Sequence, residues 1–420
     1  MLKKIADTTK IIADYKLLEM FITGVISAMP MAFLNTTMVV WLKEAEVEIA
    51  LITIFAFTKL PSSLRFLWSP FIDNYSIPLL PAKVGHRKKW FMLCALLMSI
   101  LLFLISITAP ENSLKLLFVL CFILAFISAS YDINFDAYRV EIFEPEKHAI
   151  GAASAVLGYK FGWTMLQAGG LEIASHSDSW PFTIMVISIF FSLSVIVLYI
   201  VVRDGVIKHE HHKFGANSFK DTIFQPFSDL LTKKRITIIL IGVVLFKAGE
   251  ATVTAVILPY YLEIGFTKAQ IAQAFKMFGL ASSILGAYLG VVIIRILGAI
   301  RGLIISEMLQ ISIILLVVWL KSHAEPYALY LVIIGENICE GISAVILVSY
   351  LSTLCNKQYS ASQYALLSSA SGLFGNSVAA YSGKLVEILD WPNFFIVSAA
   401  SCLPSLIIFL WLYLTSLRRP

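Results

Sequence analysis

The sequence alternates long apolar segments with short polar ones, and the apolar segments constrain the fold most. Of 420 residues, 59% are hydrophobic and 14% are charged, whereas soluble domains are about 25% charged. A helix needs about 20 apolar residues to cross a bilayer. The chain is therefore predicted to be an all-α polytopic membrane protein with 12 transmembrane helices. The predicted spans are 17–42, 49–71, 89–109, 114–138, 150–175, 181–202, 236–262, 269–294, 298–320, 326–351, 362–387 and 393–416.

The longest polar interval divides these spans into two groups of six. We interpret 204–235 as a cytosolic linker between an N-terminal half, 1–203, and a C-terminal half, 236–420. Within it, Lys208-His209-Glu210-His211-His212-Lys213 fits a metal-binding tract or a solvated basic loop, and we favour the loop. Two six-helix halves resemble the major facilitator fold, in which the substrate site lies between the halves near the midplane.

Basic residues predict the orientation of the chain. If the N-terminus is cytosolic, the cytosolic loops hold about fivefold more Lys and Arg than the loops on the other side. Both termini are therefore predicted to be cytosolic. The net charge of +5 then reflects loop topology, and no nucleic-acid partner is expected. The five cysteines show no metal-ligand spacing, so no metal or cofactor is indicated.

Charged residues inside the predicted spans point to transport. A charge at the bilayer centre costs at least ~2.5–3.5 kcal/mol, so it is retained where it faces a bundle interior or a wet path. Lys59, Lys160 and Lys247 lie about ten residues into their spans, roughly 15 Å deep. Together they would make a basic site for an anionic substrate. The alternative is that each lysine pairs with an acid, as Lys247 and Glu250 can at spacing i, i+3.

Two acidic residues share one face of the tenth predicted span. Glu336 and Glu340 are spaced i, i+4. Two desolvated carboxylates this close would not both stay ionised, and a carboxyl that holds a proton near neutral pH is what proton coupling needs. A structural polar network with Asn337 is the alternative.

The fourth predicted span carries the densest charged group. Asp132 and Asp136 are also spaced i, i+4, and Arg139 follows Asp136 at i+3, which favours an ion pair. We interpret the group as a cytosolic gate whose ion pairs break and re-form, with either aspartate as a possible proton carrier. A static anchor at the helix end is the alternative.

A second charged motif lies between the second and third predicted spans. Asp73 stands at a helix end, and Gly85-His86-Arg87-Lys88-Lys89 follows the turn. This arrangement resembles the major facilitator loop motif that locks the cytosolic side when a transporter faces outward. Asp73, Gly85, Arg87 and Lys88 are its candidate residues.

Several stretches together resemble the AmpG family of anhydromuropeptide permeases, within the group that also holds acetyl-CoA transporters. The resemblance runs from the second to the eleventh predicted span. It rests on Arg65-Phe66-Leu67-Trp68-Ser69-Pro70-Phe71-Ile72-Asp73, Gly85-His86-Arg87-Lys88-Lys89-Trp90, Ser128-Ala129-Ser130-Tyr131-Asp132-Ile133-Asn134-Phe135-Asp136-Ala137, Leu157-Gly158-Tyr159-Lys160, Phe246-Lys247-Ala248-Gly249-Glu250-Ala251, Glu336-Asn337-Ile338-Cys339-Glu340-Gly341 and Ser362-Gln363-Tyr364-Ala365-Leu366-Leu367-Ser368-Ser369.

The resemblance implies a transporter, not an enzyme, of the bacterial inner membrane. Its cargo would be N-acetylglucosaminyl-1,6-anhydro-N-acetylmuramic acid and its peptide forms, imported with protons for cell-wall recycling. In some bacteria this cargo also signals β-lactamase induction. The expected partners are thus an anionic amino sugar or peptide, protons and the lipid bilayer, and the expected state is a monomer.

This sequence departs from the family pattern at a few positions that bear on the choice of cargo. Tyr131 stands where the family usually has Gln, and Lys59 where a small residue is usual. We therefore add Tyr131 and Asn337 to Lys59, Lys160 and Lys247 as candidate substrate-binding residues. Two other hypotheses stay open, a transporter of another anionic metabolite such as acetyl-CoA or a nucleotide, and a membrane-embedded transferase.

Overall fold

The first half of the chain folds into helices that are interrupted near prolines. A computed structural model describes residues 15–48, 55–77, 84–203 and 218–417. In the first of these ranges, a π-helical turn follows Pro30 closely. The elements up to residue 203 are α2 (Tyr15–Ala32), η1 (Phe33–Thr37), α3 (Met38–Glu44), η2 (Phe55–Lys59), α5 (Leu60–Leu64), η3 (Arg65–Leu67), α6 (Ser69–Asn74), α7 (His86–Ser106), α8 (Pro110–Ile142), η4 (Pro145–Lys147), α9 (His148–Ser177) and α10 (Trp180–Val201).

The second half follows a helix in the predicted linker. This helix, α11 (Ser218–Thr232), is amphipathic and precedes the long helices of the second half. The later elements are α12 (Ile236–Phe246), α13 (Ala248–Glu263), α14 (Lys268–Ala274), η5 (Phe275–Gly279), α15 (Leu280–Leu297), α16 (Ala299–Leu320), α17 (Pro326–Leu354), η6 (Lys357–Tyr359), α18 (Ser360–Ala400) and α19 (Leu403–Leu417).

The predicted all-α polytopic class is confirmed. Among the described residues, nine segments are long and apolar enough to cross a membrane. One of them, Lys357–Thr415, contains two predicted spans, because α18 bends at Asp390, where φ is 59°. Another predicted span, 150–175, corresponds to α9, which is not among these nine segments.

The second predicted span is broken into η2, α5, η3 and α6. Pro61 stands in the first turn of α5 and Pro70 in the first turn of α6. A proline lacks the backbone N–H and fixes φ, so it starts a helix well and interrupts one that is already running. Residues 49–54, the beginning of this span, lie outside the described residues.

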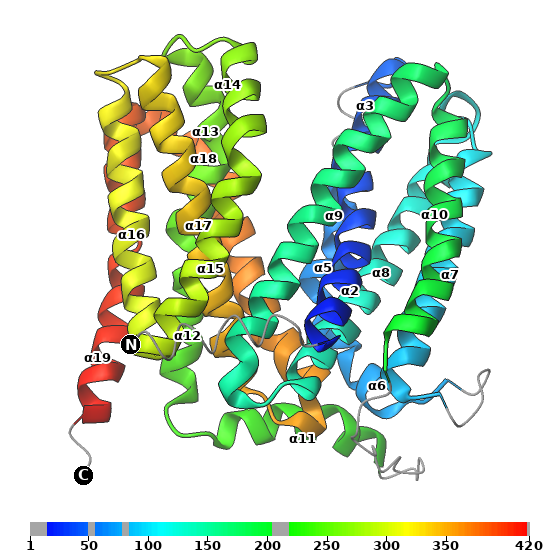
Figure 1. Cartoon of the computed structure of the whole chain (residues 1–420), viewed down its shortest axis with the longest axis horizontal. Helices are drawn as coiled ribbons and strands as arrows, with labels where there is room; N and C mark the ends of the chain where they lie inside the picture. Colours follow the sequence, from blue (N-terminus) through cyan, green and yellow to red (C-terminus); the bar gives the residue numbers. More distant parts are fainter. Residues whose placement is uncertain (1–14, 49–54, 78–83, 204–217, 418–420) are drawn as a thin grey trace.

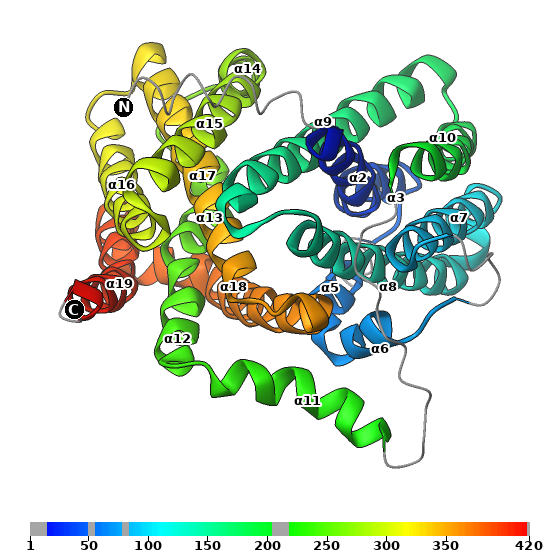
Figure 2. The same cartoon turned by 60° about the horizontal axis from the view of Figure 1, so that its bottom comes forward.

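The helices gather in two groups. Figure 1 shows α2 to α10 on one side and α12 to α19 on the other, and Figure 2 shows α18 beside α8 and α5 of the first group. One apolar core extends through the first group from Met20 to Val202, and a separate one in the second group includes Val253 and Cys402. The residue limits of the predicted halves remain a prediction.

Close contact between α2 and α9 fixes how α9 is turned. A Cβ at Gly158 would lie 2.3 Å from the carbonyl oxygen of Phe21, and one at Gly162 would lie 2.2 Å from that of Val25. Only glycine therefore allows these backbones to touch at this distance. Because the two glycines are spaced i, i+4 and face α2, Lys160 between them points to another side of α9.

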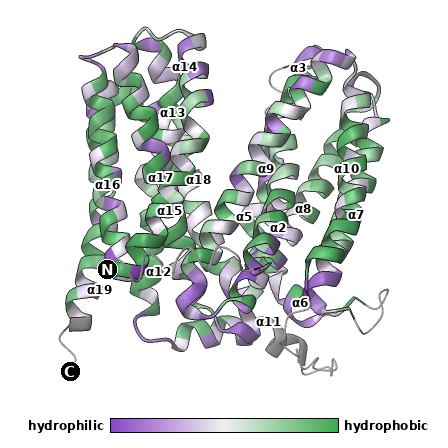
Figure 3. Ribbon diagram, viewed as in Figure 1, coloured by the Kyte–Doolittle hydropathy of each residue, from purple (hydrophilic) through white to green (hydrophobic). Residues whose placement is uncertain are grey.

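Polar residues gather at the two ends of the molecule. Figure 3 shows hydrophilic residues near α6 and α11 and, at the opposite end, near α3 and α14, whereas apolar residues cover the middle of the helices. At the end with α6 and α11, the amide nitrogen of Gln363 on α18 donates to the carbonyl oxygen of Pro226 at 3.0 Å and to Oδ2 of Asp229 at 2.7 Å. The linker helix α11 is thus held against α18. The predicted basic tract from Lys208 to Lys213 lies outside the described residues.

Candidate functional site

Buried charged residues join the two groups of helices at the α6 end. Nη2 of Arg87 lies 2.8 Å from Oδ1 of Asp73 and 2.6 Å from Oε1 of Glu141, and all three side chains are at most 6% exposed. The same Nη2 donates to the hydroxyl of Ser360 at 3.2 Å, and Ser360 donates to Glu141 at 2.6 Å. We call Asp73, Arg87, Glu141, Ser360 and Ser362 the gate cluster.

Asp73 also caps the N-terminus of α18. Its carboxylate accepts hydrogen bonds from the backbone N–H of Ala361 at 3.1 Å and of Ser362 at 2.8 Å, and from the hydroxyl of Ser362 at 2.6 Å. The first N–H groups of a helix have no partner within the helix and carry a partial positive charge. The buried carboxylate of Asp73 therefore links α6 in the first group to α18 in the second.

Two other residues of the predicted loop motif, Gly85 and Lys88, lie outside the gate cluster. Gly85 directly precedes α7 with an extended backbone, and its carbonyl accepts the N–H of Lys89 at 3.1 Å. The ammonium of Lys88 lies 4.6 Å from the centre of the Tyr199 ring on α10. Successive residues in a helix are rotated by about 100°, so Lys88 turns away from the direction of Arg87. In this conformation Lys88 is not part of the gate cluster.

Asp136 lies between two arginines. Its Oδ2 is 3.1 Å from Nη2 of Arg65, and its Oδ1 is 2.8 Å from Nη1 of Arg139. The predicted pair of Asp136 with Arg139 is therefore present. Both arginines also contact α18, since Arg65 donates to the hydroxyl of Ser368 at 2.6 Å and Arg139 stacks 4.6 Å from the centre of the Tyr364 ring.

Asp132 has a single polar partner, whereas its neighbour Tyr131 packs in the apolar core. Oδ1 of Asp132 accepts a hydrogen bond from Ser27 at 2.5 Å, and Asp132 makes no ion pair with any described residue. Tyr131 is fully buried, with its hydroxyl donating to the carbonyl of Thr23 at 3.2 Å and its ring 4.9 Å from that of Phe91. Tyr131, predicted to bind substrate, is a core residue in this conformation and offers no surface to a cargo.

Lys160 bridges the two groups of helices near the middle of their length. Its ammonium on α9 lies 2.9 Å from Oε2 of Glu340 on α17 and donates to the hydroxyl of Ser283 on α15 at 2.9 Å. Ser283 in turn donates to Oδ1 of Asn337 at 3.1 Å. The Lys160 side chain is 20% exposed and that of Glu340 is 44% exposed. This bridge is accessible, unlike the gate cluster.

The second central lysine pairs within its own group. The ammonium of Lys247 lies 2.9 Å from Oε1 of Glu250, as the i, i+3 spacing predicts. Glu336 accepts a hydrogen bond from the hydroxyl of Tyr261 at 3.3 Å. Glu336 and Glu340 therefore have separate partners.

Lys59 stands apart from these residues. It ends η2 and is exposed, and no ion pair with it occurs among the described residues. With Lys160 and Lys247 each beside a carboxylate, the alternative in which lysines pair with acids describes this conformation.

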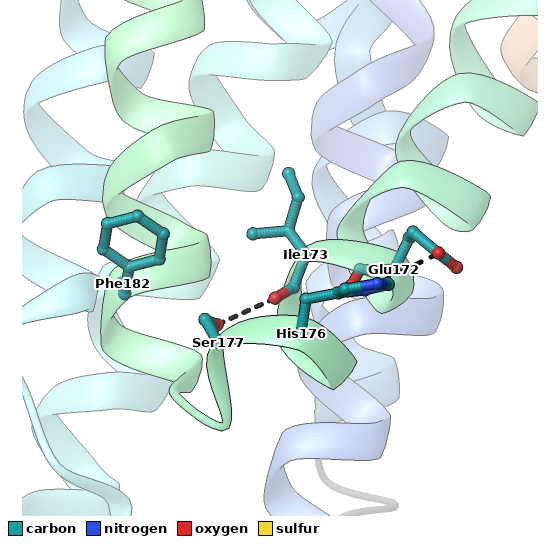
Figure 4. A pocket seen from close by; sticks show the side chains of 5 residues that line it. All are labelled: Glu172, Ile173, His176, Ser177 and Phe182. Carbon is teal, nitrogen blue, oxygen red and sulfur yellow. Dashed lines mark hydrogen bonds and ion pairs between the residues drawn. The ribbon is translucent and has the colours of Figure 1, made fainter.

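A pocket of about 400 Å³ at the far end of α9 is separate from these charges. Figure 4 shows its lining, and Ser177 there donates to the carbonyl of Ile173 at 2.8 Å. His176 and Glu172 approach to 3.6 Å but are about three-quarters exposed. Exposed pairs contribute little, so this pocket offers no strong site for a charged ligand.

Several residues of the site were not predicted from the sequence. Glu141 lies two residues beyond Arg139 in the charged group of the fourth predicted span, and Ser362 begins one of the stretches that carry the family resemblance. Nothing in the sequence pointed to Ser360. No group of His, Cys, Asp or Glu in the described part of the chain could hold a metal ion. The contacts between the two groups of helices thus form two layers, the gate cluster with Asp136 at one end and the Lys160 bridge nearer the middle.

A family model and two sequence relatives match almost the whole chain. The family model of the Major Facilitator Superfamily matches residues 20–380. The chain is 39% identical to the protein named AmpG 4 of Rickettsia conorii over 96% of this chain and 98% of that protein. It is 28% identical to the anhydromuropeptide permease of Escherichia coli K12 over 93% of this chain and 78% of that protein.

Solved structures show the same fold at low sequence identity. The transporter FucP, crystallised in an outward conformation, gives a TM-score of 0.69 at 12% identity and covers 94% of this chain and 98% of its own. The proton:xylose symporter XylE gives a TM-score of 0.67 at 13% identity, with 94% of each chain covered.

Proposed function

Because the chain belongs to the Major Facilitator Superfamily and, within it, to the AmpG family, we propose that it imports anhydromuropeptides with protons across a bacterial inner membrane. It is a multi-pass membrane transporter, so its small-molecule substrate crosses unchanged. A relative whose name states a cargo, the anhydromuropeptide permease of Escherichia coli K12, is similar over 93% of this chain. The ion pair of Lys160 with Glu340 carries the proposal, because it places an accessible cation between the two halves.

The proposed orientation puts the gate cluster at the cytosolic end. The basic loops lie on this side in the predicted topology, and both termini are then cytosolic. The gate cluster and the arginines around Asp136 join the halves there. We infer that this conformation is closed toward the cytosol and receives cargo from the periplasm.

Binding of an anionic cargo would change the partner of Lys160. A carboxylate of the cargo and that of Glu340 compete for one ammonium. When the cargo takes Lys160, Glu340 loses its cation, and the ion pair that joins α9 to α17 is broken. One event would thus load the anion and release α9 from α17.

Substitution of Lys160 tests this step. Lys160→Gln is expected to weaken binding of a disaccharide anhydromuropeptide by roughly 10–100-fold, because a hydrogen bond to a charged group is worth ~1.5–3 kcal/mol. Affinity for an analogue with amidated carboxyl groups should change much less. Binding to purified protein is the measurement, and Lys384→Gln, at an exposed lysine on α18, is the matched control.

Equal losses for the charged cargo and the amidated analogue would contradict this role and make Lys160 a structural residue. Competition by nucleotides but not by amino sugars would instead assign a different anionic cargo.

A further inference from the structure

Glu307 is a buried acid that the proposed transport cycle does not yet use. It lies on α16, eight residues from the start of that helix, and is 1% exposed. Burying an ionised carboxylate is very unfavourable unless it is paired with a cation and hydrogen-bonded. Its presence in an apolar span therefore requires an explanation.

The surroundings of Glu307 supply no cation. Against α16 pack α13, α15, α17, α18 and α19, and the titratable groups from these elements that act on it are Glu250 of α13, Cys339 of α17 and Cys402 beside α19. No described charged residue of α15 or α18 contributes to the electrostatic environment of the Glu307 carboxyl. No ion pair with Glu307 occurs in the described part of the chain. The charge that acts on Glu307, on Glu250, is of the same sign.

The hydrogen-bond partners of Glu307 can serve either a carboxylate, by donating to it, or a protonated carboxyl, by accepting from it. Its neighbours are the Ser405 hydroxyl and the Cys402 thiol, while its Oε1 has no partner. Ser405 can direct its own hydrogen to the carbonyl of Gly242 at 3.2 Å, and Cys402 can direct its hydrogen to the carbonyl of Ser398 at 3.8 Å. Each then has a lone pair for a proton on Glu307, which a neutral acid supplies and a carboxylate lacks.

Glu307 is electrostatically linked to the Lys247–Glu250 pair. Gln310 lies one turn further along α16 and accepts the thiol hydrogen of Cys339 at 3.3 Å. Glu250, which acts on both Cys339 and Glu307, is paired with Lys247. The charge on Glu307 therefore bears on the strength with which Glu250 holds Lys247.

We propose that Glu307 is a second proton-binding site, in the C-terminal half, whose loss and uptake of a proton is linked to the Lys247–Glu250 pair during transport. When Glu307 is neutral, it does not repel the charge on Glu250, which is paired with Lys247. When its proton leaves toward the cytosol, the new negative charge repels Glu250 and disfavours a cargo anion beside that pair. This inference rests on the proposed proton-coupled function and names a group through which release of proton and cargo is linked.

The substitution Glu307→Gln keeps the size of the side chain and removes the titratable proton. We expect the variant to bind cargo and to exchange it across liposomes at equal pH as the unmodified protein does. Its accumulation of cargo driven by a pH gradient should be lost. One pH unit supports about tenfold accumulation per proton, so the expected loss is about that factor. Glu325→Gln, at an exposed acid before α17, is the matched control.

Infrared spectroscopy separates this inference from the proposed cargo. Purified protein should show a protonated-carboxyl band that loses intensity when the pH is raised and that is absent in Glu307→Gln. This measurement needs no cargo, so it stands even if the anhydromuropeptide is not transported. The absence of such a band, a band that does not respond to pH, or full gradient-driven accumulation by Glu307→Gln would overturn the proposal.

A second variant distinguishes the proton from the shape of the side chain. Glu307→Asp keeps a carboxyl group and is expected to keep gradient-driven accumulation. Loss of accumulation in both variants would mean that the shape of the side chain matters and not its proton, which would also overturn the proposal.

Discussion

Replacing Asp136 by asparagine is expected to stop concentrative uptake while leaving a folded protein. The carboxylate of Asp136 holds Arg65 and Arg139, and both arginines contact α18. Removing one member of a buried ion pair costs about 3–5 kcal/mol, which corresponds to roughly 10²- to 4 × 10³-fold in the balance between two conformations. Asparagine fills the same volume, so the fold should persist. Uptake into liposomes, with thermal stability in detergent, is the measurement.

The matched control for this variant is Glu144→Gln. Glu144 is exposed just beyond α8, so its substitution removes the same charge without breaking a buried pair and should leave uptake unchanged. Full accumulation by Asp136→Asn would exclude Asp136 from gating and from proton coupling.

The second large effect is expected at Asp73. Asp73→Asn should open the cytosolic end, because an amide cannot accept all the hydrogen bonds that the carboxylate accepts from Arg87 and from the N-terminus of α18. Each hydrogen bond to a charged group is worth ~1.5–3 kcal/mol, so loss of two would shift the population strongly. Spin labels at exposed Glu146 and Gln358, one in each half, should report a longer distance.

The control for Asp73 lies at the opposite end of the molecule. Asp178 is exposed and has a left-handed backbone, which asparagine tolerates well, so Asp178→Asn should leave the label distance as it is. An unchanged distance distribution in Asp73→Asn would mean that the gate cluster does not hold this end closed.

Contacts within one helix were predictable from the sequence, and contacts between helices were not. The pairs of Asp136 with Arg139 and of Lys247 with Glu250 follow from i, i+3 spacing, since such residues share a helix face. The bridge from Lys160 to Glu340 joins residues 180 positions apart, and no local rule selects that pairing. Its formation depends on how α9 is turned by its close contact with α2.

Burial was the harder property to predict. Tyr131 differs from the family pattern next to Asp132, which suggested a cargo contact, yet its ring packs in the core because its helix presents that face to Phe91. Lys88 belongs to the loop motif but turns toward Tyr199. Glu307 has no charged residue at helical spacing that would draw attention to it. A single sequence shows which residues carry charge, whereas helix packing decides which of them are buried.

The most direct test of the proposed function is uptake by the purified protein in liposomes. Labelled disaccharide anhydromuropeptide is supplied outside, with and without an inward proton gradient, and the cargo is recovered and identified. We predict that cargo accumulates unchanged and only with the gradient, by about tenfold for each coupled proton per pH unit. Failure of a folded preparation to accumulate it, or accumulation that is indifferent to the gradient, would contradict a proton-coupled muropeptide importer.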